Sequence, residues 1–445
     1  DKIDGLLELP IDAPVGVDIR EYLNLDDHVI DISITPNRGD CFSIRGIARE
    51  IGVINQLTVT APEINAVAAT IADEKKVVVS TEGCPRYLGR VIKNVNTKAA
   101  TPEWMERALV RSGIRQHSIL VDITNYVLME LGQPLHAFDA AKIQGSVQVR
   151  QANTAEKLVL LNEQEVELNE KVMVIADDEK ALAIAGIMGG LSSSVTDETQ
   201  DIFLESAFFA PLAIAGRARS FGLHTDASQR YERGVDFELP MLAMHRASQL
   251  IAELAGGEFG PITIAEQAAV LPKREAIELE QAQVDQLLGY RVDAAFIADA
   301  LTRLGCAVTV KAEGQWSVVP PSHRYDMAIY QDLIEEVARI HGYDNIQISL
   351  PKIEAKLAQY QDQFEMAQLR QTLVTLGYQE AISFSFADLK LEKQLNAAVN
   401  PLALANPISS DLAVMRSTLL SSLIPCVQYN VNRQQSRVRF FELGL

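Results

Sequence analysis

The stretch Cys306-Ala-Val-Thr-Val-Lys-Ala-Glu-Gly-Gln-Trp-Ser-Val-Val319 alternates apolar and polar side chains on both sides of Glu313-Gly314. Two such runs, separated by a short turn that contains glycine, predict an antiparallel hairpin. Helical patterns precede and follow this hairpin. We therefore expect residues 273–349 to form a small α+β module in the order strand, helix, helix, hairpin, helix, which is compatible with a winged-helix-like fold.

The longer region from 83 to 258 is expected to be rich in β-structure and to carry a helix at each end. The first helix is predicted with Thr101 as its N-cap and Pro102 at its first position, and it ends near Gly113. The second is predicted over residues 240–255, before two glycines. Short strands separated by polar turns are predicted at Val147–Arg150, Leu158–Leu161 and Val172–Ile175.

The two ends of the chain are expected to belong to further domains. Residues 1–60 are interpreted as the remnant of an N-terminal core domain, with a strand at Ile30–Ile34 and a helix from Ser43 to Gln56. Residues 355–445 begin another domain, with a helix that ends at Gly377 and a strand at Ala381–Phe386. Because the chain opens on Asp1 and closes in a strand-like run, we expect a piece of a longer, multidomain α+β protein.

Composition restricts the class of protein. The 445 residues suffice for about three domains, and no apolar run approaches the roughly 20 residues of a membrane-spanning helix. With a formal net charge of −19, the overall electrostatic field of the chain does not attract polyanions. Any contact with nucleic acid must therefore be made by a local group of basic residues. The four cysteines lie far apart without metal-ligand spacing, which favours a reducing, cytoplasmic compartment.

An acidic helix face is the first candidate site. Asp332, Glu335 and Glu336 stand at helical spacings of three and four, so their carboxylates share one face close to Asp326. A hard cation such as magnesium would relieve their mutual repulsion. The alternative is a solvated acidic face partly neutralised by Arg339, and on spacing alone this alternative is favoured.

The second candidate surrounds His136, which Asp139 follows by three residues as a possible partner for the imidazole. Upstream, the strand-like run Val121–Tyr126 is interrupted by the polar residues Asp122, Thr124 and Asn125. No serine or cysteine forms a nucleophile motif beside them, so any chemistry here is expected to be attack by water. A structural, hydrogen-bonded histidine is the favoured alternative when only the sequence is considered.

The third candidate combines the glycine pair Gly189-Gly190, the acidic Glu205 after an apolar run, and a cluster of arginines. Glycines permit close approach of a ligand to the backbone, although such a pair is more often a turn. The arginines are the place where a phosphate backbone is expected to contact this acidic chain, unless they pair with Glu232 and Asp236. They are Arg217, Arg219, Arg230 and Arg233.

Taken in order along the chain, several stretches resemble the beta subunit family of bacterial phenylalanyl-tRNA synthetases over nearly the whole length. Long motifs in one order are a specific signal. The stretches are Thr35-Pro-Asn-Arg38, Cys84-Pro-Arg-Tyr-Leu-Gly-Arg90, Val121 to Val127, Gly132 to Asp139, Thr225-Asp-Ala-Ser228 with Arg230 to Gly234, and Arg324-Tyr-Asp326 with Asp332 to Gly342.

This resemblance implies that residues 83–258 are the family's B3/B4 editing domain, which hydrolyses tRNA-Phe mischarged with tyrosine. Glu205 is then expected to meet the tyrosine hydroxyl, which an apolar synthetic site rejects poorly. The implied catalytic residues are His136, Glu205, Thr124 and Asn125, and the implied pocket residues are Gly189, Thr225 and Ala227.

The resemblance also implies that residues 273–349 are the B5 domain. Asp326, Asp332, Glu335 and Glu336 then match magnesium ligands shared with an alpha subunit, which reverses the preference for a solvated face. Residues 355–445 resemble the start of a class II synthetase-like catalytic fold without its own chemistry. ATP and phenylalanine are expected to react on the alpha subunit of a tetramer of two alpha and two beta chains, with tRNA-Phe as the other partner and no membrane.

The function implied is therefore support of tRNA-Phe charging together with editing hydrolysis. An alternative is a noncatalytic tRNA-binding or subunit-assembly module whose editing pocket is inert. A third interpretation, a winged-helix regulator that binds DNA through residues 273–349, is disfavoured by the acidic faces there.

Overall fold

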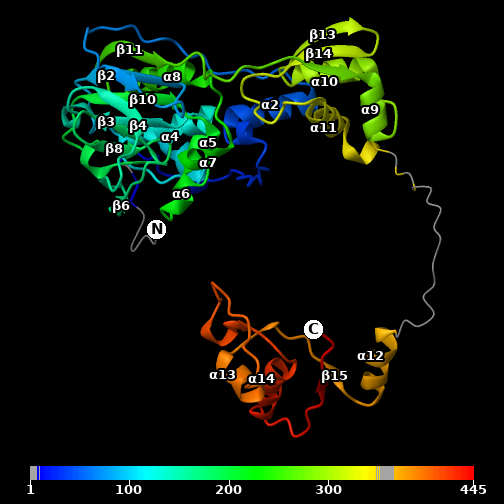
Figure 1. Cartoon of the computed structure of the whole chain (residues 1–445). Coiled ribbons are helices and arrows are strands. Elements are labelled where there is room, and N and C mark those ends of the chain that lie inside the picture. The colour runs from blue at the N-terminus through cyan, green and yellow to red at the C-terminus, as the bar shows by residue number, and fades with distance from the viewer. Residues whose placement is uncertain (1–7, 10, 347, 349, 351–364, 445) are drawn as a thin grey trace. The chain divides into compact units, whose positions relative to one another are not determined.

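The computed structural model describes residues 8–9, 11–346, 348, 350 and 365–444. The chain divides into two compact units, Asp1–Ser349 and Leu350–Leu445. Both units mix helices with strands, so the predicted α+β class is confirmed (Figure 1). Among the described residues, no helix is both long and apolar enough to cross a lipid bilayer.

Two sheets form the centre of the first unit. One has the strand order β1 (Val77–Val79), β4 (Val147–Gln151), β7 (Met173–Ala176), β8 (Ala181–Ile184), β9 (Met188–Gly189). The other has the order β11 (Glu258–Glu266), β2 (Arg86–Lys93), β10 (Ile202–Phe208), β3 (Leu135–Asp139), with all neighbours antiparallel. A separate hairpin joins β5 (Lys157–Val159) to β6 (Glu165–Glu167). The strands predicted at 147–150 and 172–175 are thus confirmed to within a residue, and β5 covers part of the third.

The four-stranded sheet is the middle layer of three. Along β2, Tyr87 and Val91 face the five-stranded sheet and share its core. The alternate residues Leu88 and Ile92 face the opposite way, into a core made with helices α3 (Glu103–Arg111), α4 (Ile119–Leu131) and α8 (Leu239–Leu254). Because both faces are covered, every residue of β10 is buried. A polar residue on β10 therefore lies inside the protein.

Two local predictions in this region are wrong. The run Val121–Tyr126 is not strand-like but forms the middle of α4, because Ile119, Ile123 and Val127 recur every four residues on one buried face. The N-cap of α3 is Pro102 rather than Thr101. The Thr101 hydroxyl instead donates to the Asp122 carboxylate at 2.6 Å.

The small module confirms the predicted order of elements. It runs β12 (Ile277–Glu280), α9 (Gln281–Leu288), α10 (Ala294–Arg303), the hairpin β13 (Ala307–Ala312) and β14 (Gln315–Val319), and α11 (Tyr330–His341). Its sheet has the order β12-β14-β13. Trp316 and Val318 point from the central strand into a core that α11 covers with Leu333 and Val337.

The N-terminal segment contributes one well-formed helix. After α1 (Ile19–Tyr22), helix α2 (Ile44–Asn55) starts where the Ser43 hydroxyl accepts the Gly46 amide and stops where Gln56 turns left-handed, as predicted. The predicted strand Ile30–Ile34 is wrong, because no described strand pairs with it and Ile30 is 79% exposed. Alternation alone does not make a strand, since a strand also needs a neighbour for its backbone hydrogen bonds.

The second unit contains α12 (Met366–Thr375), β15 (Gln379–Glu380), β16 (Phe386–Ala387), α13 (Leu389–Leu395), β17 (Val414–Met415), α14 (Leu420–Val431) and β18 (Phe440–Phe441). β15 pairs with β18, and β16 with β17. The strand predicted at Ala381–Phe386 is wrong except at Phe386, since Ile382 is 93% exposed and outside any strand. The part of the predicted domain at 355–364 lies outside the described residues.

Candidate functional site

Two titratable side chains lie directly opposite each other in the middle layer. The register of β3 against β10 pairs His136 with Glu205. Strand alternation places both side chains on the face that Phe138 and Phe203 share with the five-stranded sheet. A histidine and a glutamate therefore meet between two sheets, which neither residue's sequence neighbourhood predicts.

This pair borders a cavity of about 70 Å³. Four of the predicted site residues line it, namely His136, Gly189, Glu205 and Ala227. The rest of the lining is largely apolar and comes from β7, β8 and the loop through Ile187, together with Pro134 and Tyr231. The His136 ring lies close over Gly189, because a Cβ atom there would lie 2.6 Å from Cε1 of His136.

His136 is neutral at physiological pH, because burial lowers its pKa to about 4. Its ring packs edge-on against Phe138, with 4.4 Å between the ring centroids. Within the described chain, its buried Nε2 has no hydrogen-bond partner. A neutral imidazole with an unpaired nitrogen beside a cavity is available to bond a ligand or a water molecule.

Asp139 does not orient the imidazole of His136, so this predicted pair is wrong. Residues three apart on a strand point to opposite faces. The Asp139 carboxylate instead accepts the Thr199 hydroxyl at 2.8 Å and the Ala141 amide at 3.1 Å. Lys142 lies 3.4 Å from the same carboxylate.

Glu205 is held by a residue that the sequence analysis missed. The Tyr87 hydroxyl donates to Oε2 of Glu205 at 2.7 Å, and both side chains are buried. Burial raises the pKa of Glu205 to about 7, although the hydrogen bond from Tyr87 acts in the opposite direction. The strand pattern of Cys84 to Arg90 was the available signal for Tyr87, but only the pairing of β2 with β10 places it near Glu205.

The wall opposite the pair is braced by three short helices, α5 (Pro211–Ile214), α6 (Arg217–Ser220) and α7 (Asp226–Arg233). Thr225 caps α7, and its hydroxyl donates to the Ile187 carbonyl at 2.9 Å. Thr225 therefore supports the wall, whereas Ala227 lines the cavity. Behind them Gln133 bonds the Tyr231 hydroxyl at 3.1 Å and the Ala207 carbonyl at 2.8 Å.

Thr124 and Asn125 are not brought into this cavity. Both lie on α4, where the Thr124 hydroxyl donates to the Val121 carbonyl one turn earlier at 2.8 Å. Their predicted catalytic role stays a prediction, and it would require a part of the ligand that extends beyond the cavity.

The arginine cluster is partly used inside the protein. Arg230 and Arg233 stack over the Phe42 ring, with guanidinium carbons 5.6 Å and 4.8 Å from its centroid. Arg230 also pairs with Asp226 at 2.9 Å, which is neither of the acidic partners considered from the sequence. Through Phe42 these two arginines hold the segment before α2 against α7. Of the four arginines in the cluster, only Arg219 is exposed.

The predicted magnesium ligands lie around α11 but do not form a cage. Glu336 is buried and accepts bonds from Arg324 at 2.9 Å and from Arg339 at 2.5 Å. Asp326 accepts a bidentate bond from Arg324 at 2.9 Å and 2.8 Å. Asp332 accepts the Ala328 and Ile329 amides at the start of the helix, and Glu335 is exposed.

Two of these four carboxylates are therefore already neutralised by arginine, so the residues as arranged do not fit a four-carboxylate magnesium site. Within the described ranges, the acidic group with metal-ligand spacing is Asp40, Cys41 and Glu50. The Arg38 guanidinium already bonds all three, at 2.9 Å, 3.1 Å and 2.6 Å. Magnesium binding stays a prediction.

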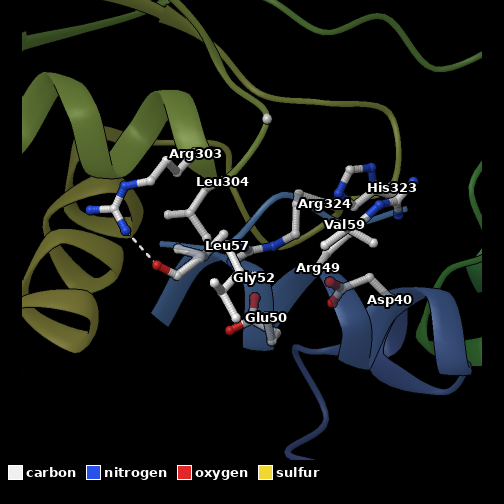
Figure 2. Close-up of a pocket in the computed structure, with 12 residues that line it drawn as sticks. Asp40, Arg49, Glu50, Gly52, Leu57, Val59, Arg303, Leu304, His323 and Arg324 are labelled. Atoms are coloured by element: carbon white, nitrogen blue, oxygen red, sulfur yellow. Dashed lines mark hydrogen bonds between the residues drawn. The ribbon is translucent and has the colours of Figure 1, made fainter. Parts of the chain in front are cut away.

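A second cavity of about 300 Å³ adjoins this arginine network (Figure 2). Figure 2 shows the side chains of Asp40, Arg49 and Glu50 from the N-terminal segment near those of Arg303, His323 and Arg324 from the small module. Glu50 joins the two parts, because it accepts bonds from both Arg38 and Arg339. The carboxylates at this junction are thus engaged in structural ion pairs.

Three family models match successive parts of the chain. Residues 83–256 match the B3/4 domain, residues 277–343 match the tRNA synthetase B5 domain, and residues 346–445 match the phenylalanyl tRNA synthetase beta chain CLM domain. Together these matches define a subunit of an aminoacyl-tRNA synthetase.

Individual relatives show which aminoacyl-tRNA synthetase this subunit resembles. The chain is 79% identical over 445 residues to the phenylalanine–tRNA ligase beta subunit of Acinetobacter baylyi, and 57% identical over 451 residues to that of Psychrobacter arcticus. It belongs to the family of phenylalanine–tRNA ligase beta subunits. Each alignment covers 100% of this chain and 56% of the relative, so the chain spans about half the length of the curated relatives it matches.

One solved structure is also similar. It is an N-terminal fragment of the phenylalanyl-tRNA synthetase beta-subunit from Pyrococcus horikoshii, of which 86% aligns with 70% of this chain at 17% identity. The TM-score of 0.35 is too low to support a statement about the fold.

Proposed function

We propose that residues 83–258 hydrolyse tRNA-Phe mischarged with tyrosine, within a phenylalanine–tRNA ligase whose alpha subunit performs the charging. The observation that carries this proposal is the direct pairing of His136 with Glu205 on the wall of an otherwise apolar cavity. ATP and magnesium belong to the whole ligase in this proposal, with tRNA-Phe and the alpha subunit as partners. The implied compartment is the cytoplasm.

Glu205 supplies the discrimination. A buried carboxylate that accepts a bond from a tyrosine hydroxyl is satisfied, whereas a phenylalanine ring leaves it without that partner. Sites built to bond a hydroxyl reject the analogue that lacks it by about 10⁴-fold or more. Burial raises the pKa of Glu205 to about 7, so at pH 7 about half of the molecules carry the ionised carboxylate that accepts the hydroxyl.

His136 supplies a polar contact close to that carboxylate. Burial keeps the imidazole neutral, and its unpaired Nε2 accepts or donates one hydrogen bond according to its tautomer. With a pKa of about 4 it is a weak base. We therefore assign His136 to the orientation of the water or ester, so that most of the rate comes from positioning.

The cavity must open to admit an amino acid. Its volume of about 70 Å³ is well below the roughly 300–1,000 Å³ of typical ligand sites. Met188 lies at this wall and is only half-buried, so its flexible side chain is suited to move aside. Binding thus requires displacement of side chains such as that of Met188.

The experiment is deacylation of tyrosine-charged tRNA-Phe by this chain, with phenylalanine-charged tRNA-Phe as the control substrate. Selective release of tyrosine is expected, and it should be lost in His136→Ala and Glu205→Ala while tRNA binding is retained. Equal release of both amino acids, or release that is unchanged in both variants, would contradict the assignment.

The small cavity also favours a second candidate function, a noncatalytic tRNA-binding or assembly module. In that case a chain shown to be folded would bind tRNA-Phe and the alpha subunit but release no tyrosine, either alone or in the assembled ligase. The assembled ligase is the decisive sample, because it excludes failure of tRNA delivery as the reason for inactivity.

A further inference from the structure

We propose that Tyr87 is a positioning residue that fixes the carboxyl group of Glu205 and thereby sets the hydroxyl selectivity of the cavity. The inference rests on the proposed function. It concerns a side chain that does not line the cavity, so its action on a ligand passes through Glu205.

The strand register makes this contact specific. Glu205 on β10 lies opposite Gly89 of β2, and Tyr87 lies opposite Ala207. Tyr87 is therefore the diagonal neighbour of Glu205 on the same face, a separation that an aromatic side chain can span. Gly89 leaves room for the Phe203 ring, since a Cβ atom at Gly89 would lie 2.2 Å from it.

Tyr87 cannot easily move away from this position. Its side chain is fully buried in the core between the two sheets, which also contains Cys84 and Val91. In the described structure, its hydroxyl makes one hydrogen bond, the 2.7 Å bond to Glu205. Breaking this bond would leave a buried phenol unpaired, which is costly.

The direction of this bond determines what Glu205 can do. The phenol O–H donates, so Oε2 of Glu205 is occupied as an acceptor and Oε1 is the oxygen left for a ligand. Donation to the carboxylate also favours its ionised form over the protonated form. A carboxylate kept as an acceptor is complementary to the hydroxyl of tyrosine and has no partner in phenylalanine.

The test is the substitution Tyr87→Phe, which removes one oxygen atom and keeps the ring. Without the donor, the ionised form of Glu205 loses stabilisation and its titration midpoint should rise by about one pH unit. At pH 7 the ionised fraction of Glu205 would then fall from about one half to about one tenth, so the kcat/KM for release of tyrosine from tRNA-Phe should fall about fivefold and recover at higher pH. A role in packing alone would lower activity at every pH without moving the midpoint.

The matched control is Tyr325→Phe. It also removes a phenol bond, the 2.6 Å donation from Tyr325 to the Val235 carbonyl, but it lies outside the cavity. Its pH profile for tyrosine release should match that of the unsubstituted chain. A shift of the midpoint in both variants would show a general effect on the fold and would overturn the proposal.

A second readout does not depend on catalysis. The carboxyl of Glu205 is followed by NMR in the full chain labelled with ¹³C-glutamate, and its resonance is assigned with Glu205→Gln. A higher titration midpoint of Glu205 in Tyr87→Phe supports the positioning role even if no tyrosine is released. In that case only the proposed function fails. An unchanged midpoint overturns the positioning role even if the chain edits normally.

Discussion

Gly189 and His136 approach so closely that a Cβ atom on the glycine would lie 2.6 Å from Cε1 and 2.8 Å from Nε2 of the imidazole. The glycine lies on β9 at the edge of one sheet and the histidine on β3 at the edge of the other. Their proximity closes the cavity between the sheets, so its shape depends on a residue without a side chain.

The substitution Gly189→Ala should strongly reduce tyrosine release with little loss of stability. The new methyl group must displace the His136 ring, which is a side chain and can turn, so the backbone is spared. We expect a fall in kcat/KM of about 100-fold and a nearly unchanged thermal midpoint.

The neighbouring Gly190→Ala is the contrast for that measurement. Its Cβ atom would lie 2.5 Å from the Leu182 carbonyl oxygen, which is backbone and cannot turn away. This variant should lose about 2 kcal/mol or more of stability. Equal thermal midpoints for Gly189→Ala and Gly190→Ala would show that the strand positions are not those described.

The substitution Glu205→Gln should remove the discrimination between tyrosine and phenylalanine. The amide keeps the size of the side chain but lacks the charge that attracts the substrate hydroxyl. Tyrosine release should fall about 100-fold or more, and in the unsubstituted chain it should increase with pH through about 7 as Glu205 ionises. A flat pH profile in the unsubstituted chain would exclude Glu205 as the titrating group.

The ion pairs of Glu336 should make the first unit sensitive to acid. Burial opposes ionisation of Glu336, but bonds from Arg339 and Arg324 prevail and lower its pKa from 4.5 to about 2. A depressed carboxyl pKa gives stability that is present above the unfolded value of 4.5 and is lost as pH falls towards 2. The contribution at neutral pH is on the order of 3 kcal/mol.

The measurement is chemical denaturation between pH 7 and pH 3 for the unsubstituted chain and Glu336→Gln. The variant should be less stable at pH 7 and should change less as the pH falls. Glu335→Gln is the control, because Glu335 is exposed on the same helix. A steep acid dependence that survives in Glu336→Gln would place the responsible carboxylate elsewhere.

The predicted magnesium site has its own test in Glu335→Ala. Since Glu335 is exposed, its removal should not disturb the fold, so a decrease in bound magnesium would report ligation directly. Ligation by the predicted set would give lower magnesium content and weaker association with the alpha subunit at a retained thermal midpoint, whereas the arginine pairs of Asp326 and Glu336 argue for no change. Unchanged magnesium content in both Glu335→Ala and Asp332→Ala would exclude the predicted ligand set.

Local patterns predicted several elements well because their signals are short-range. The alternation on both sides of Glu313-Gly314 predicted the β13–β14 hairpin, and Ser43 predicted the start of α2. The pattern failed at Val121–Tyr126, because a short apolar run has the same appearance in a strand and in a buried helix. It failed again at Ile30–Ile34, where alternation has no described neighbour to pair with.

The amino-acid sequence by itself determined the family, the mixed α+β class and the residue types at the candidate site, including His136, Gly189, Glu205 and Ala227. Only the tertiary structure decided that His136 faces Glu205 rather than Asp139 and that Tyr87 bonds Glu205. It also decided that Glu336 forms ion pairs with two arginines. The physical reason is the range of the interaction. Turns, caps and periodicity act between residues close in the chain, whereas strand register and buried ion pairs join residues that only folding brings together.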